Sequence, residues 1–132
     1  PEHAGVQRML KDLNHLYAST PALHEVDFSD AGFEWIDWGD RDNGVLSWLR
    51  RDKHGGFIVC VTHLTPVRRD KFRIGVPEEG SYKVVLNTDA EQYGGSGTGA
   101  QTVVSVKSEQ HGRPYSIEVT LPPLGTLFLE RH

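Results

Sequence analysis

The sequence predicts a mainly β fold, an antiparallel sandwich or barrel, preceded by a single α-helix. Two observations support this prediction. Apolar residues near the N-terminus recur every three or four positions, which is the period of a helix face. After Asp27, short apolar runs alternate with clusters of turn residues, and about eight such strands are typical of antiparallel sandwiches and barrels.

The first predicted element is an amphipathic helix that ends before Pro21. Its apolar face consists of Val6, Met9, Leu10, Leu13, Leu16 and Tyr17. Pro21 ends the helix because its ring disfavours helical geometry in the preceding residue. The apolar face is wide for a single helix. It therefore has to be buried, against either the β module or a domain outside this chain.

The strands are predicted from apolar runs that are separated by turn residues. They are Phe33–Asp37, Val45–Arg51, Phe57–Leu64, Lys71–Ile74, Tyr82–Asn87, Thr102–Lys107, Tyr115–Leu121 and Thr126–Glu130. The clearest alternation lies in residues 115–121. It predicts that Tyr, Ile, Val and Leu point inward and that Ser116, Glu118 and Thr120 point outward.

Composition limits the classes of partner. The chain has 132 residues and a net charge of −4, which favours one soluble domain and argues against nucleic acid or an anionic membrane as partner. It has no apolar stretch of membrane-spanning length and no signal peptide, so a cytoplasmic protein is expected. The chain starts at Pro1, and a lone helix before a β module suggests a segment of a larger protein.

The residues predict no catalytic, cofactor or metal site. The glycine-rich stretch Tyr93–Gly99 precedes strand residues rather than a helix, so a phosphate loop is not expected. The histidines lack the spacing of metal ligands, and the carboxylate pairs Asp40/Asp42 and Glu78/Glu79 fall in predicted turns. The single Cys60 lies in an apolar run and is expected to be a buried hydrophobic residue.

Three tryptophans are candidates for a sugar contact, because a flat indole face can stack on the apolar face of a sugar ring. Trp48 lies in a strongly apolar strand and is assigned to the core. Trp35 and Trp38 differ in parity, so they are predicted to point to opposite faces of their strand, with at least one exposed. Trp35 is the preferred candidate; the alternative is that it shares the core with Phe33.

Ordered motifs along the chain resemble the bacterial glycogen branching enzymes of the α-amylase superfamily. The motifs are His3–Arg8, Asp12–Asn14, Pro21–Phe28, Gly32–Ile36, Val45–Arg51, Leu64–Val67, Leu86–Asp89, Tyr93–Gly97 and Leu121–Leu127. The resemblance runs almost from end to end. It implies an antiparallel β-sandwich of the α-amylase C-terminal-domain type, over residues 27–132. Residues 1–26 would then be the last helix of the catalytic barrel and a linker.

The resemblance also implies the chemistry of a parent enzyme. Such an enzyme cleaves an α-1,4 bond in a glucan and transfers the chain to a 6-hydroxyl, using two carboxylates in a retaining double displacement. No residue here matches the motifs of those carboxylates. The segment is therefore expected to be inactive alone, to pack on the barrel, and to contact α-glucan through Trp35, with Asp40 and Asp42 near the ring. The alternative is a free-standing carbohydrate-binding or protein-interaction module.

Overall fold

The computed structural model describes residues 2–24, 32–40, 43–93, 95, 97 and 102–131. The helices are α1 (Glu2–Ser19) and α2 (Pro21–His24), and a 3-10 turn, η2, covers Glu91–Tyr93. The strands are β1 (Phe33–Asp40), β2 (Val45–Arg51), β3 (Phe57–His63), β4 (Arg69–Val76), β5 (Ser81–Asn87), β6 (Thr102–Val104), β7 (Tyr115–Leu121) and β8 (Thr126–Arg131). The predicted boundary between residues 26 and 27 lies outside the described residues.

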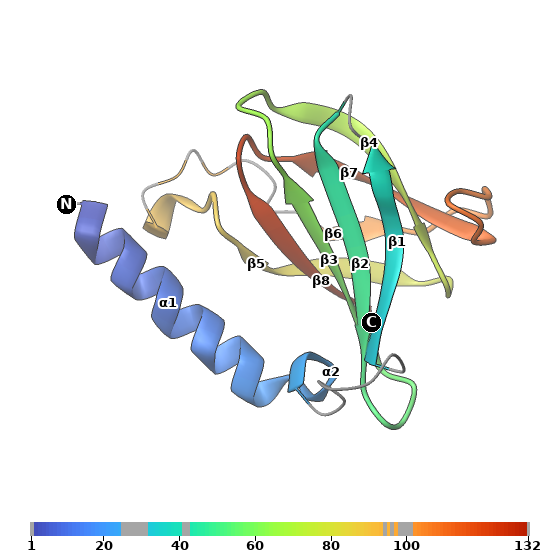
Figure 1. The fold of residues 1–132 in the computed structure, drawn as a ribbon, viewed down its shortest axis with the longest axis horizontal. Helices are drawn as coiled ribbons and strands as arrows, with labels where there is room; N and C mark the ends of the chain where they lie inside the picture. Colours follow the sequence, from blue (N-terminus) through green and yellow to red (C-terminus); the bar gives the residue numbers. More distant parts are fainter. Residues whose placement is uncertain are drawn as a thin grey trace.

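The strands form two antiparallel sheets, as the sequence predicts. The larger sheet has the order β1-β2-β3-β8-β5-β6, and the smaller sheet pairs β4 with β7. Helix α1 lies outside both layers on one flank, with η2 beside its N-terminal half and α2 following its C-terminal end (Figure 1). The prediction of an antiparallel sandwich with an N-terminal helix is confirmed, and the short α2 is an addition to it.

The main hydrophobic core lies between the two sheets. Its fully buried side chains come from both layers and include Leu49, Val59, Ile74, Val76, Tyr82, Ile117, Leu121, Leu127 and Leu129. The predicted inward set of β7 is confirmed. Ser116 of the same strand lies on the outer face with Glu118, as predicted, since Arg73 contacts both side chains, but it is covered there rather than exposed. Its hydroxyl accepts a 2.8 Å hydrogen bond from Arg73, and its backbone pairs with Val106, so the residue is buried.

The strand ends differ from the prediction where the chain changes sheet. Strand β6 ends at Val104 rather than at Lys107, because Val106 leaves the larger sheet and bridges to Ser116 of the smaller one. Strand β1 continues past Asp37 to Asp40 through two shifts in its register with β2. The alternation of apolar residues could not predict where a strand changes its partner, because backbone hydrogen bonds form these pairings.

Trp48 lies on the outer face of the larger sheet, so its assignment to the sandwich core is wrong. In β2 it is Leu49 that points inward, and Trp48 packs half-buried in a second cluster on the other face. The buried and half-buried members of this cluster are Ala22, Leu23, Trp48, Ile58, Cys60, Val85 and Phe128. Strand β2 is apolar on both faces, so an apolar run could not indicate which face meets the smaller sheet. Cys60 is buried as predicted.

Helix α1 turns only part of its apolar face toward the sandwich. Val6, Leu10 and Tyr17 are 51%, 55% and 49% exposed, and we call them the α1 stripe. Pro21 ends α1 as predicted, but it also begins α2, because a proline fits the first turn of a helix. The α1 stripe is about half exposed, with the centroid of the Tyr17 ring 5.5 Å from that of the His24 ring.

Candidate carbohydrate-contact site

An aromatic cluster lies at the edge of the larger sheet. Phe33 and Trp35 of β1 meet Trp48 of β2, and the ring centroids are 5.2 Å apart for Phe33–Trp35, 6.0 Å for Trp35–Trp48 and 6.5 Å for Phe33–Trp48. Trp35 stands edge-on to both other rings, at interplanar angles of 87° and 73°. Such edge-to-face contacts add stability beyond burial alone.

The strand register explains why these rings meet. Trp35 is the direct cross-strand partner of Trp48, and Phe33 shares the face of Trp35 because the two are two residues apart. Strand β1 is the last strand of the sheet, so no further strand covers the outer side of the cluster. As a result, Trp35 is 44% exposed. Phe33 is 37% exposed, so the alternative that Trp35 shares the core with Phe33 is wrong. Trp35 is nevertheless packed against two other rings.

Charged groups hold the backbone of β1 in place. Glu34 forms ion pairs with Arg113 and with Arg51, the latter at 3.5 Å. Arg113 also donates a 3.3 Å hydrogen bond to the carbonyl oxygen of Trp35. These contacts fix the segment that carries the candidate ring. Glu34 is thereby engaged by two guanidinium groups, which suits a structural carboxylate rather than a general acid.

Trp38, the other candidate on β1, is 69% exposed. The prediction that Trp35 and Trp38 face opposite ways assumed regular alternation, and the two register shifts between Trp35 and Asp40 break that alternation. Both rings are exposed, Trp35 at the sheet edge and Trp38 within the irregular stretch of β1. The side chain of Asp40 and all of Asp42, which were predicted to accept hydrogen bonds from a sugar, lie outside the described part of the chain.

The remaining candidates for chemistry in the described ranges are groups of metal-ligating side chains and the single thiol. No cluster of three or more His, Cys, Asp or Glu side chains there is arranged to hold a metal ion. Burial raises the pKa of the Cys60 thiol to about 12, although the nearby Arg50 lowers it in part. A buried thiol that stays protonated does not act as a nucleophile. In the same part of the chain, neither helix combines the length and the apolar character needed to cross a membrane.

A cavity of about 350 Å³ lies between α2, the β2–β3 turn and the end of β8. Its lining residues are Thr20, Pro21, Ala22, Asp52, His54, Gly55, Gly56, Phe57, Glu78, Glu130 and Arg131. A second gap of about 220 Å³ separates α1 from β5 and is lined in part by Asp12, Leu16 and Tyr93. Neither of these two cavities is lined by Trp35 or Trp38.

Comparison with known families agrees with this geometry. Residues 35–132 match the model of the alpha amylase C-terminal all-beta domain. The chain belongs to this family. A solved alpha-amylase from H. orenii has the same fold over 95% of this chain and 20% of its own, with a TM-score of 0.54 and 17% sequence identity.

Curated relatives extend the similarity beyond the β domain. The chain is 52% identical over 132 residues to the 1,4-alpha-glucan branching enzyme GlgB of Dechloromonas aromatica. It is 48% identical to the enzyme of that name from Rubrobacter xylanophilus and 46% identical to that from Aquifex aeolicus. These alignments cover 97–99% of the chain but only 18–21% of the relatives. The chain therefore spans about a fifth of their length, and α1 lies within the similarity.

Sequence reasoning identified the three tryptophans but not the groups that hold them. Arg113 was not singled out, because it lies 78 residues from the Trp35 carbonyl that it contacts. His111 contacts Asp37 in the same way, from the loop before β7. Only the approach of that loop to β1 in space reveals both, and no local pattern in the sequence signals it.

Proposed function

We propose that this chain is the non-catalytic C-terminal domain of a cytoplasmic 1,4-α-glucan branching enzyme. The whole enzyme would cleave an α-1,4 bond and transfer the freed chain to a 6-hydroxyl, which creates a branch. The observation that carries the proposal is the 46–52% identity over nearly the whole chain to proteins of that name. The two carboxylates of a retaining transfer would lie outside this segment.

In this proposal, residues 1–26 pack on the catalytic barrel and residues 27–132 form the supporting sandwich. Helix α1 lies outside the family's domain model, which begins at residue 35, yet within the alignments to the longer relatives. The α1 stripe is about half exposed. Burial of large apolar side chains is worth about 1.5–3 kcal/mol each, so a covering surface is expected.

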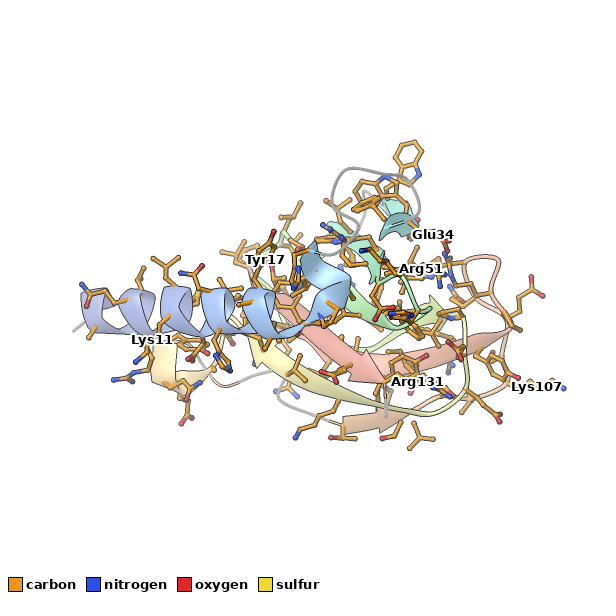
Figure 2. The ribbon with its side chains drawn as sticks, turned by 90° about the horizontal axis from the view of Figure 1, so that it is seen from below. Lys11, Tyr17, Glu34, Arg51, Lys107 and Arg131 are labelled. Atoms are coloured by element: carbon orange, nitrogen blue, oxygen red, sulfur yellow. The ribbon has the colours of Figure 1, made fainter. Side chains whose placement is uncertain are left out.

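The catalytic part of the same protein is the partner that we propose for the stripe. Figure 2 shows Tyr17 and Glu34 in the upper half of the view, so the Tyr17 end of the stripe and strand β1 lie toward the same side of the molecule. The side of α1 that meets the sandwich is mixed: Arg8 donates a 2.9 Å hydrogen bond to the carbonyl oxygen of Gln92, and Leu16 lines the gap between α1 and β5. The α1 stripe would then be left for the barrel.

Hydrogen exchange can test this docking. Amides near Val6, Leu10 and Tyr17 should exchange more slowly in the complete enzyme than in the 132-residue chain. Amides in the core strands β3 and β8 should be equally protected in both and serve as the internal control. Equal exchange of the α1 amides in the two proteins would contradict docking through the stripe.

The second part of the proposal is an α-glucan contact at the edge formed by β1. The aromatic cluster of Phe33, Trp35 and Trp48 supports it, because Trp35 is 44% exposed and rigidly packed. An ordered aromatic surface loses little conformational entropy when a sugar stacks on it. A single stacking contact would bind with a Kd of about 1 mM.

The catalytic part of the proposal has a direct test. The 132-residue chain should convert no amylose, as followed by iodine staining and reducing ends, whereas the complete enzyme should lower iodine staining without releasing many reducing ends. Conversion by the short chain alone would overturn the non-catalytic assignment. A coding sequence without an upstream barrel would instead favour a free-standing carbohydrate-binding or protein-interaction module.

A further inference from the structure

Trp38 is the most exposed aromatic side chain among the described residues. It is 69% exposed, compared with 44% for Trp35 and 37% for Phe33. In the described part of the chain, no hydrogen bond or ring contact engages the Trp38 side chain. The Trp38 ring is therefore largely open to solvent, whereas the Trp35 ring already packs against two neighbours.

An irregularity in β1 produces this exposure. Trp38 is two residues from Ile36, which is 7% exposed and lies in the main core, so regular alternation would also turn Trp38 toward the core. The register runs from Asp37 opposite Ser47 to Asp40 opposite Val45, so β1 spends one residue more than β2 over this stretch. Trp38 lies inside this bulge. Bulges re-aim side chains, and this one turns the ring outward.

The bulge is fixed to the second sheet through two side chains. The Asp37 carboxylate spans Trp38, since its Oδ1 accepts a 3.2 Å hydrogen bond from the backbone N–H of Gly39. Its Oδ2 lies 3.4 Å from His111 Nε2. Nδ1 of His111 accepts a 3.1 Å hydrogen bond from the N–H of Gly75 on β4, so in the neutral ring Nε2 carries the proton. The backbone that presents Trp38 is therefore held from both sides.

We propose that Trp38 is the principal stacking surface for an α-1,4-glucan chain, and that Asp37 and His111 are positioning residues for it. This inference rests on the glucan contact in the proposed function. A single indole flanked in sequence by Asp37, Gly39 and Asp40 suits a sugar, whose ring offers an apolar face bordered by hydroxyls. A docked protein would instead need a continuous apolar patch.

Titration of the 132-residue chain with maltoheptaose tests the inference. Binding is followed by backbone amide shifts and by calorimetry. Trp38→Ala should weaken binding by at least about fivefold, whereas Trp38→Phe should retain part of it because an aromatic face remains. Trp35→Ala is the matched control on the same strand, and it should change the affinity less than Trp38→Ala does. Because the Trp38 side chain is 69% exposed, its variants should nearly keep the urea midpoint of the parent chain.

The positioning role needs a readout of its own. His111→Ala should weaken maltoheptaose binding and also lower the steady-state fluorescence anisotropy of Trp38, measured in a background where Trp35 and Trp48 are phenylalanine. His111→Gln can keep a hydrogen bond to Asp37 and should restore part of both values. Unchanged anisotropy in His111→Ala would overturn the positioning role.

The remaining outcomes separate this inference from the function on which it rests. If the parent chain binds no maltoheptaose at concentrations far above the millimolar range, the glucan contact itself fails, and the role of Trp38 fails with it. If Trp35→Ala abolishes binding and Trp38→Ala does not, the glucan contact stands at Trp35 and the inference is overturned. Quenching of Trp38 by acrylamide in the short chain but not in the complete enzyme would show a protein-covered ring, which also overturns it.

Discussion

The hydroxyl of Tyr93 donates a 2.5 Å hydrogen bond to the carboxylate of Asp12, and this contact ties the N-terminal helix to the sandwich. Gly5 of the same helix lies against the Tyr93 backbone, and Arg8 donates a hydrogen bond to the carbonyl oxygen of Gln92. The helix therefore approaches the sandwich with a mixed polar side. These contacts fix the rotation of α1 about its own axis, and the α1 stripe points away from the sandwich.

Gly5→Ala should release α1 from η2. A Cβ at this position would lie 2.5 Å from the carbonyl oxygen of Tyr93, which is backbone and cannot move aside cheaply. Ala stabilises a helix relative to Gly by about 1 kcal/mol. Helix α1 should therefore stay folded while its docking on η2 fails. The measurement is a titration of the Tyr93 phenol by its absorbance. Burial, then the bond to Asp12, raises its pKa, which should fall toward the ordinary value on release.

Ala18→Gly is the matched control for this prediction. It changes helix propensity by about the same amount in the opposite sense, at an exposed position outside the η2 contact. It should lower helicity and leave the Tyr93 titration unchanged. A Gly5→Ala chain whose Tyr93 titrates as in the parent chain would show that the helix shifts without undocking, and the prediction would be wrong.

Trp48→Ala should cost less than a core substitution. Trp48 is half-buried on the outer face, so the loss of burial and of its aromatic contacts should lower the free energy of unfolding by about 2 kcal/mol. Leu129→Ala in the fully buried core should cost about 2–5 kcal/mol. Urea unfolding of both variants compares them. A Trp48 variant that is clearly less stable than the Leu129 variant would mean that the outer cluster carries more of the fold than its exposure indicates.

Most of the strand order could be predicted from the sequence because apolar runs and turn residues are local signals. Strands β2 and β7 have the predicted bounds, and the inward set of β7 is correct. The face of Trp48 could not be predicted in this way, since β2 carries apolar side chains on both sides. When both faces of a sheet are partly covered, apolar and polar residues do not alternate along the strand, so the sequence does not show which face lies in the core.

The candidate site was predictable only in part. Trp35 could be chosen because an indole stacks on a sugar ring and because the turn carboxylates Asp40 and Asp42 lie close to it in the sequence. The exposure of Trp38 depends on a bulge, and a bulge arises from the pairing of β1 with β2 and with the loop that carries His111 and Arg113. The contacts of His111 with Asp37 and of Arg113 with the Trp35 carbonyl join residues more than 70 positions apart, and no periodicity within β1 encodes them.

Cys60 should make the fold less stable at alkaline pH. Its pKa rises from 9.0 to about 12 on folding, chiefly because burial disfavours the thiolate, so its contribution is fully present below pH 9 and is lost as the pH rises from 9 toward 12. The urea midpoint of Cys60→Ala should therefore fall less over this range than that of the parent chain. Tyr82, whose pKa burial also raises to about 12, is common to both proteins and cancels in the comparison.

Thiol labelling gives an independent check on the same residue. In the folded chain, Cys60 should react slowly with a thiol reagent because it is buried. The labelling rate should barely increase between neutral and mildly alkaline pH, because the thiol stays protonated. Unfolding in urea should restore rapid labelling. Fast reaction in native buffer would contradict the burial of Cys60 beneath α2.

His63 should be the most costly polar residue to replace in the sandwich. Its buried ring bridges two segments: Nδ1 lies 2.9 Å from the carbonyl oxygen of Pro122, and Nε2 lies 2.6 Å from the Thr65 hydroxyl. A carbonyl only accepts, so Nδ1 carries the proton and Nε2 accepts from Thr65. His63→Phe fills the space but leaves both partners unpaired, at about 1–3 kcal/mol for each buried group. Thr62→Val, which removes a half-buried hydroxyl contact on the same strand, should cost less. Equal urea midpoints for the two variants would show that water replaces the bonds of His63.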